Sequence, residues 1–182
     1  MLYTNPAAHA QIQGELMEPF LTSTIKSQLR DRSWTSSTYV ASTNGRGDGL
    51  YAQRPFRRGE LVLQYEGEQI SEAEAERREV RYASEDKTCC LLHFTSHAGE
   101  RLVIDPTDNT TAGQKINHSI DPNLTPKVFE VDGQSIVAFL AKENIATDSE
   151  LFFNYFQGER PSRCKDIPWA AFKRVSIVIS KC

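Results

Sequence analysis

Apolar residues recur every four or five positions along the first thirty residues of the chain. They form one helical face, which comprises Ile12, Leu16, Phe20, Ile25 and Leu29. Asn5 followed by Pro6 suits a helix start, with an N-cap and then proline at the first helical position. The pattern predicts a helix over about 5–32. We expect it to kink or restart at Pro19, because proline lacks the backbone N–H that a helix interior needs.

From about residue 37, short runs rich in β-branched and aromatic residues replace the helical spacing. We expect strands near 39–40, 50–52, 61–65, 91–95, 101–104, 127–131 and 135–140. Ser71-Glu72-Ala73-Glu74 is a capping box that predicts a helix over 71–82, and a helical turn is expected at 170–173. Asp132-Gly133 is typical of a hairpin turn. Many short strands with few helices indicate an α+β domain that is mainly β.

The composition is that of an ordinary globular domain. The chain has 182 residues, of which 39% are hydrophobic and 25% charged, so one core can form without disulfides or metals. The net charge of −3 argues against a nucleic-acid binder and is compatible with a basic peptide partner. The apolar run Val175 to Ile179 is too short to cross a membrane.

Four cysteines, Cys89, Cys90, Cys164 and Cys182, match no zinc spacing and no disulfide framework. No signal peptide is recognisable, so we interpret the cysteines as reduced and the protein as intracellular. Three short motifs resemble adhesion or glycosylation signals of secreted proteins, namely Arg46-Gly47-Asp48, Asn109-Thr110-Thr111 and Asn117-His118-Ser119. Because we expect an intracellular protein, we interpret them as chance matches.

Three clusters have residue types that could carry chemistry. The glycines at alternate positions between 45 and 49 either expose backbone amides to a ligand or form a tight turn. Asn117-His118-Ser119 is either a polar binding group or a satisfied turn network. The aromatic run 152–156 is either the wall of a narrow channel that ends in the Tyr155 hydroxyl or a core strand. No cluster decides between its alternatives by itself.

The order and spacing of the clusters resemble the SET domain over residues 38–172. The matching segments are Gly45–Ala52, Phe56–Val62, Tyr65–Ile70, Asn117–Ser119 and Glu150–Tyr155. Within that family, the chain is most similar to the branch that monomethylates a lysine of the histone H4 tail. The features shared with the branch are the helix end Arg78–Ala83, the Asp132-Gly133 hairpin, the closing Pro168-Trp169 and the lack of cysteine-rich zinc clusters.

The resemblance implies a SET-domain fold of several small sheets with a knot-like C-terminal segment. It divides the chain into an N-terminal helical extension (1–36), the SET domain (37–160) and a segment that closes the cofactor site (161–182). The implied activity is transfer of a methyl group from S-adenosylmethionine, without a metal, to a lysine in a basic peptide. A histone tail or nucleosome is the expected partner, with histone H4 first. A nuclear monomer that contacts neither membrane nor nucleic acid directly is expected.

The family's functional residues carry over motif by motif. Tyr155 matches the catalytic tyrosine. The positions expected to bind the cofactor are Arg46, Gly47, Leu50, Asn117, His118 and Trp169. Those expected to line the substrate channel are Tyr65, Cys90 and Phe153. Trp169 is alternatively a tryptophan that only covers the surface.

Several positions depart from the branch pattern. Phe153 and Cys90 stand where tyrosines are expected, Gln114 replaces an arginine, Lys115 an apolar residue, and Asn154 an aspartate. Family behaviour implies that Phe153 relaxes the limit on methylation, so that dimethylation or trimethylation becomes accessible. Cys90 implies a wider channel. Two alternatives stay open: a catalytically silent SET fold that serves as a binding module, and an unrelated β-rich interaction domain.

Overall fold

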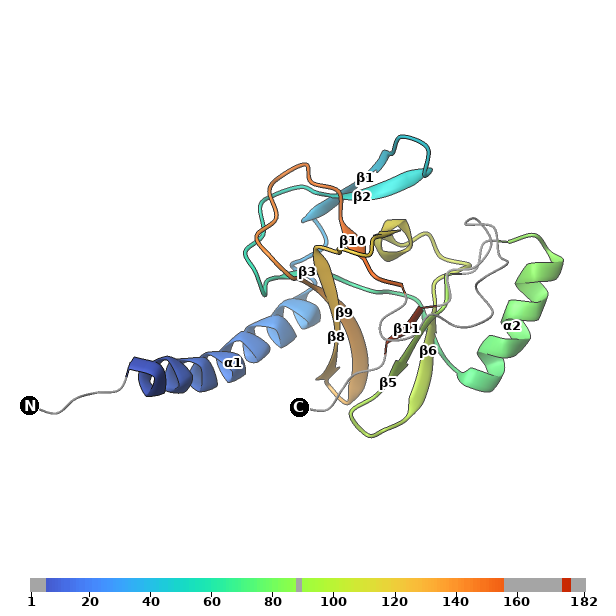
Figure 1. Ribbon diagram of the computed structural model, residues 1–182. Coiled ribbons are helices and arrows are strands. Elements are labelled where there is room, and N and C mark those ends of the chain that lie inside the picture. Colours follow the sequence, from blue (N-terminus) through green and yellow to red (C-terminus); the bar gives the residue numbers. More distant parts are fainter. Residues whose placement is uncertain (1–5, 88–89, 156–174, 178–182) are drawn as a thin grey trace, which may run out of the picture.

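The computed structural model describes residues 6–87, 90–155 and 175–177. Helix α1 (Pro6–Asp31) is one continuous helix, so the restart predicted at Pro19 does not occur. In Figure 1 this helix projects from a body of small sheets and meets the body only at its C-terminal end.

The strands of the described residues form four small sheets. Two of them are pairs: β1 (Thr38–Ser42) with β2 (Asp48–Ala52), antiparallel, and β7 (Asn117–His118) with β10 (Phe152–Phe153), parallel. The third has the order β3 (Leu61–Gln64), β9 (Gln134–Ala141), β8 (Leu124–Val131). The fourth has the order β11 (Val175–Ile177), β5 (Leu92–Thr95), β6 (Arg101–Asp105), β4 (Glu68–Ser71).

Helix α2 (Glu72–Ser84) and the short 3-10 helix η1 (Ala112–Lys115) complete the described elements. The predicted start of α2 is confirmed, since the Ser71 hydroxyl accepts a hydrogen bond from the Glu74 N–H at 3.2 Å. The sequence pattern missed β4, β7, β11 and η1. Strand β4 has one buried residue in four, which leaves too little apolar pattern to detect. The helical turn predicted at 170–173 lies outside the described residues.

One main core joins the sheets, and the end of α1 belongs to it. Ile25 and Leu29 of α1 and the following Trp34 are at most 6% exposed and pack in the same cluster as Val62 and Phe139. Burial of a leucine or isoleucine typically stabilises a fold by about 2–5 kcal/mol relative to alanine. The last turns of α1 therefore hold the helix to the body.

Helix α2 is anchored by a buried ion pair. The Asp105 side chain accepts hydrogen bonds from Arg78 Nη1 and from the Tyr82 hydroxyl, both at 2.8 Å. Burial alone raises the pKa of Asp105, but hydrogen bonds from Thr107 and Arg78 outweigh it and lower the pKa. The ionised Asp105 therefore fixes α2 against β6, while Arg78 also contacts Glu68 of β4 at 2.7 Å.

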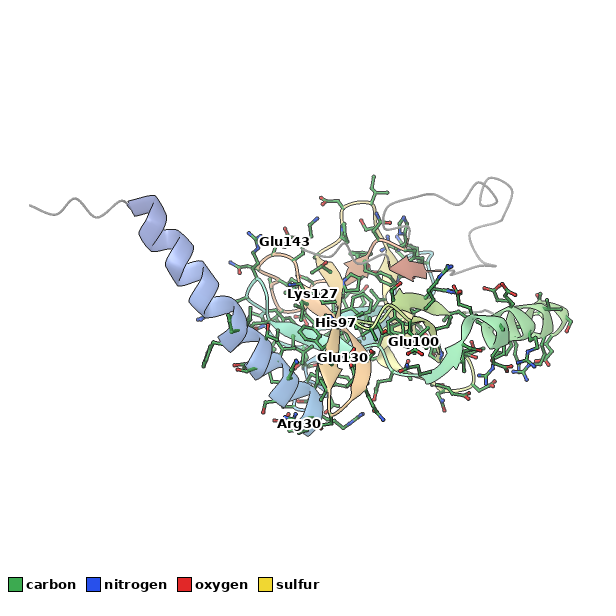
Figure 2. All side chains as sticks on the ribbon, turned by 90° about the horizontal axis from the view of Figure 1, so that it is seen from below. Arg30, His97, Glu100, Lys127, Glu130 and Glu143 are labelled. Carbon is green, nitrogen blue, oxygen red and sulfur yellow. The ribbon has the colours of Figure 1, made fainter. Side chains whose placement is uncertain are left out.

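Strand β8 lies at the edge of its sheet, and its outer side is partly closed. His97, in the turn between β5 and β6, hydrogen-bonds through Nε2 to the Val128 carbonyl at 3.1 Å. Figure 2 shows His97 beside Lys127 and Glu130 of this strand. Pro126 in the same strand has no backbone N–H to offer. The two features protect the edge from pairing with another chain.

Candidate active site

Two segments more than thirty residues apart meet at the parallel pair of β7 and β10. Asn117 lies opposite Phe152, and His118 lies opposite Phe153. The Ser119 N–H donates to the Phe153 carbonyl at 3.2 Å and extends the pairing by one bond. The structure thus brings the second and third sequence clusters together, and the polar group proves to be a short strand and not only a turn.

Tyr155 follows this junction and is almost fully buried, with 7% exposure. Its hydroxyl donates a hydrogen bond to the Ile116 carbonyl at 2.6 Å. Its backbone N–H donates to Nδ1 of His118 at 3.2 Å, and the two rings lie 5.2 Å apart. Since Nδ1 accepts this bond, the neutral His118 ring carries its proton on Nε2.

Burial shifts the pKa values of both rings toward their neutral forms. It lowers the pKa of His118, and the opposing effect of the Phe153 backbone is smaller. Burial raises the pKa of Tyr155 far above its usual value, and the neighbouring Cys90 thiol adds to the effect. Tyr155 is therefore a permanent O–H donor over the physiological pH range.

An apolar aromatic cluster surrounds Tyr155. Its ring is 4.6 Å from that of Phe153, which in turn is 4.7 Å from Phe139. Phe139 packs edge-on against Tyr65 at 6.1 Å, and the Tyr65 hydroxyl donates to the Cys90 carbonyl at 2.6 Å. The three residues predicted for the substrate channel, Tyr65, Cys90 and Phe153, thus lie in one cluster with Tyr155.

A polar cluster contacts the Asn117 side of β7. Glu150, just before β10, forms an ion pair with Arg46 at 2.7 Å and accepts from the Asn117 side-chain amide at 2.9 Å. Lys115 pairs with Asp48 at 2.8 Å. We call this group, Arg46, Asp48, Lys115, Asn117 and Glu150, the polar clamp.

The glycine loop is the turn between β1 and β2. Gly45 and Gly47 have φ values of +85° and +75°, which side chains rarely adopt, and no atom lies within 4 Å of where a Cβ would stand. Gly49 is different, because a Cβ there would lie 2.9 Å from the Glu150 carboxylate and 3.3 Å from the Asn117 amide. The loop is therefore open at its tip and tight at its base.

A sequence profile of the SET domain matches residues 47–156 of this chain, which is more than half of its length. The matched range contains the β7–β10 junction, the aromatic cluster and most of the polar clamp. The chain belongs to the SET-domain family. The predicted family and the predicted α+β, mainly β fold are both confirmed.

Relatives of this SET domain include proteins named as methyltransferases. The chain is 37% identical over 129 residues to "Histone-lysine N-methyltransferase Set8" of Drosophila melanogaster, over 70% of this chain and 18% of that protein. It is 32% identical over 126 residues to "N-lysine methyltransferase KMT5A" of Xenopus tropicalis, over 69% of this chain and 37% of that protein. The chain thus spans well under half of these relatives' lengths.

Two solved structures share the fold. CpSET8 from Cryptosporidium matches with a TM-score of 0.68 and 27% identity, over 74% of this chain and 64% of that one. A ctPRC2 structure in an autoinhibited conformation, bound to S-adenosylmethionine, matches with a TM-score of 0.58 and 32% identity, over 66% of this chain and 15% of that one.

Most of the predicted site residues converge in this SET domain. Arg46 and Gly47 lie in the glycine loop, and Leu50 is fully buried in β2, where its carbonyl accepts from the Leu151 N–H at 2.7 Å. Trp169 lies outside the described residues. Sequence reasoning missed Glu150 and Phe139 as members of the two clusters. In the sequence, Glu150 is the one acidic residue at the start of the aromatic run, but the sequence does not indicate which residues it contacts.

Other kinds of site find little support in the described part of the chain. No three histidine, cysteine, aspartate or glutamate side chains there gather to hold a metal ion. No helix among the described residues has the length and apolar character needed to cross a membrane.

A cleft of about 570 Å³ runs between β4, β6 and β9, and Tyr65 is the member of the aromatic cluster that lines it.

Proposed function

We propose that this chain is a protein-lysine N-methyltransferase that transfers a methyl group from S-adenosylmethionine to a lysine side chain. The observation that carries the proposal is the convergence of buried Tyr155 with Asn117 and His118 at one strand junction. The names of the relatives and the S-adenosylmethionine bound in the ctPRC2 structure support it.

The residues on the Asn117 side of the junction fit such a cofactor. The open tip of the glycine loop lets a ligand approach the backbone closely. The residues proposed to hold the cofactor are Arg46, Gly47, Leu50, Asn117, His118 and Trp169, with Leu50 acting through its backbone. When bound, the cofactor supplies an electrophilic methyl group: the neutral lysine amine would attack the methyl carbon in line with the sulfur, and the C–S bond would break to release S-adenosylhomocysteine as a neutral thioether.

The aromatic cluster suits the incoming lysine. A free lysine has a pKa of about 10.4 and must lose a proton before it can attack. The apolar surfaces of Phe153, Phe139 and Tyr155 disfavour a charged ammonium and so favour the neutral amine. The proposal therefore requires no strong side-chain base.

Tyr155 is the proposed catalytic residue. Its raised pKa keeps the hydroxyl protonated, so it remains a donor and dipole fixed by the Ile116 carbonyl. Because the proton is donated to the Ile116 carbonyl, the fixed oxygen retains lone pairs as acceptors, and an acceptor held in place before the reaction stabilises the positive charge that develops on the amine without reorganisation at the moment of transfer.

We further propose that the product extends beyond monomethyl-lysine. Phe153 has no hydroxyl with which to hold a water molecule beside the amine, and Cys90 is smaller than the tyrosine expected there. Both residues lie in the aromatic cluster with Tyr155. The room that they leave can accept a second or third methyl group.

The proposed substrate is a basic peptide, with the histone H4 tail or a nucleosome first. Residence in the nucleus follows from that substrate. We also propose that 1–36 is an N-terminal extension, 37–160 the SET domain and 161–182 the segment that closes the cofactor site. The protein acts as a monomer in this proposal.

The experiment that tests the proposal is mass spectrometry of histone octamers, nucleosomes and H4 peptide after incubation with the chain and S-adenosylmethionine. Methylated lysine is expected. Tyr155→Phe should lower the rate by about 100-fold or more, as loss of one preorganised polar group does in other enzymes. Tyr39→Phe is the matched control, since the Tyr39 hydroxyl bonds to Asp148, away from the junction.

A silent SET fold that binds peptides is the second candidate, and the thiol of Cys90 in place of a tyrosine favours it. Calorimetry with S-adenosylmethionine separates the two. No cofactor binding and no transfer to any substrate would favour the silent module. Binding together with Tyr155-dependent transfer would establish the enzyme.

A further inference from the structure

Glu150 lies where three separate segments of the polar clamp meet. One carboxylate oxygen is 2.7 Å from Arg46 of the glycine loop, and the other is 2.9 Å from the Asn117 amide of β7. Only 12% of the Glu150 side chain is exposed. A single carboxylate thus ties the loop before β2 to the strand that contains Asn117 and His118.

The Glu150 backbone is held as firmly as its side chain. Its carbonyl accepts from the Asn123 side-chain amide at 2.8 Å, and the carbonyl oxygen of the same amide accepts from the Phe152 N–H at 2.8 Å. The absence of a Cβ at Gly49 leaves the space that the carboxylate fills. The carboxylate therefore has a fixed position relative to Asn117.

This arrangement determines how the Asn117 amide is turned. Its nitrogen, Nδ2, faces the Glu150 carboxylate and, at 3.3 Å, the Asp48 carbonyl. Both partners can only accept hydrogen bonds, so the NH₂ end of the amide must face them. The carbonyl oxygen Oδ1 is consequently turned away from Glu150 and remains an acceptor.

We propose that Glu150 is a positioning residue for cofactor binding. Its carboxylate selects the amide orientation in which Asn117 Oδ1 accepts from the α-ammonium group of the cofactor. With a neutral amide at position 150, only the longer bond to the Asp48 carbonyl still favours this orientation, so a larger fraction of Asn117 rotates by 180° and presents an NH₂ group to the ammonium, which repels it. This inference rests on the proposed function, because it assumes that Asn117 contacts the cofactor.

The test compares Glu150→Gln with Glu60→Gln in the full chain. Glu60 forms the same type of ion pair, with Arg54 at 3.0 Å, but lies outside the clamp. Calorimetry with S-adenosylhomocysteine should give a Kd about tenfold higher for Glu150→Gln, as expected when one charge-assisted hydrogen bond is lost. KM for the cofactor should rise in parallel, with kcat within about twofold. Glu60→Gln should leave both unchanged.

A double-mutant cycle separates positioning from general stability. Because Glu150 acts through Asn117, Glu150→Gln should add little to the loss caused by Asn117→Ala alone. Additive losses would overturn the inference, as would an unchanged Kd in Glu150→Gln. Circular dichroism and the Tm without cofactor check the fold. If Glu150→Gln unfolds, Glu150→Asp, which withdraws the carboxylate by one methylene, gives the same comparison.

The wild-type chain distinguishes the two possible failures. If it neither binds S-adenosylhomocysteine nor transfers a methyl group, the proposed function itself is wrong. If it does both, and Glu150→Gln does so equally well, only the role of Glu150 is wrong.

Discussion

The two sides of the β7–β10 junction are built by opposite means. On one side, Phe139, Phe153 and Tyr155 form a buried cluster that depends on close packing. On the other side, the polar clamp holds its parts through paired charges and amide bonds, and Arg46 is half exposed. Adjacent residues of β7 serve different sides, since Asn117 bonds to the clamp and His118 to Tyr155. We infer that the apolar side carries stability, whereas the clamp carries orientation.

The largest effect on stability should come from a cavity created in the aromatic cluster. Phe139→Ala removes a fully buried ring that contacts both Tyr65 and Phe153. We expect the free energy of unfolding to fall by about 3–5 kcal/mol, measured by urea denaturation. Phe20→Ala is the control, because that ring is 74% exposed and its loss should change little. Equal losses for the two variants would mean that packing in the aromatic cluster does not carry the stability assigned to it.

A glycine-to-alanine substitution can be compared on the two sides of the junction, at Gly113 beside the aromatic cluster and at Gly49 beside the polar clamp. A Cβ at Gly113 would lie 2.6 Å from the buried ring of Tyr65, whose hydroxyl is bonded to the Cys90 carbonyl, so Gly113→Ala should destabilise by about 1–3 kcal/mol. At Gly49 the obstacles include the ends of the Thr43 and Glu150 side chains, and the Glu150 carboxylate can give way only by disturbing its bonds to Arg46 and Asn117. We expect Gly49→Ala to affect stability less and cofactor affinity more. The reverse ranking of the two Tm values would contradict the comparison.

His118 links the two sides and should make stability depend on pH. Burial lowers its pKa in the folded state below the ordinary 6.5, so the unfolded chain binds the proton more tightly. The free energy of unfolding should therefore fall as pH drops through 6.5 toward the folded-state pKa and lose this dependence above 6.5. His118→Gln should flatten that slope in denaturation curves between pH 5 and 7.5. A slope that persists unchanged would assign the dependence to another group.

The smallest effect should come from the outer ion pair of the clamp. Lys115 pairs with Asp48 at 2.8 Å, and both side chains are about a third or more exposed. Lys115→Gln should change the free energy of unfolding by about 0.5 kcal/mol or less, because solvent and salt screen such pairs. A loss above 1.5 kcal/mol in urea denaturation would mean that the clamp contributes to stability as well.

The sequence alone was enough to predict the elements whose pattern is local. The apolar spacing of Ile25 and Leu29 predicted the packed end of α1, and the capping residue Ser71 predicted the start of α2. Asp132-Gly133 predicted the β8–β9 hairpin, and the ordered motifs indicated the SET domain. Each helix or turn signal depends on residues a few positions apart, and the family motifs are recognised from their order along the chain, so none of them requires knowledge of the fold.

Only the tertiary structure decided which residues meet. Glu150 faces Arg46 across about a hundred positions, and Phe139 joins the aromatic cluster from the middle of β9. The parallel pairing of β7 with β10 also has no local sequence signal, since each strand is only two residues long. Contacts of this kind form only when the whole core packs together, so the local sequence around either residue does not reveal its partner.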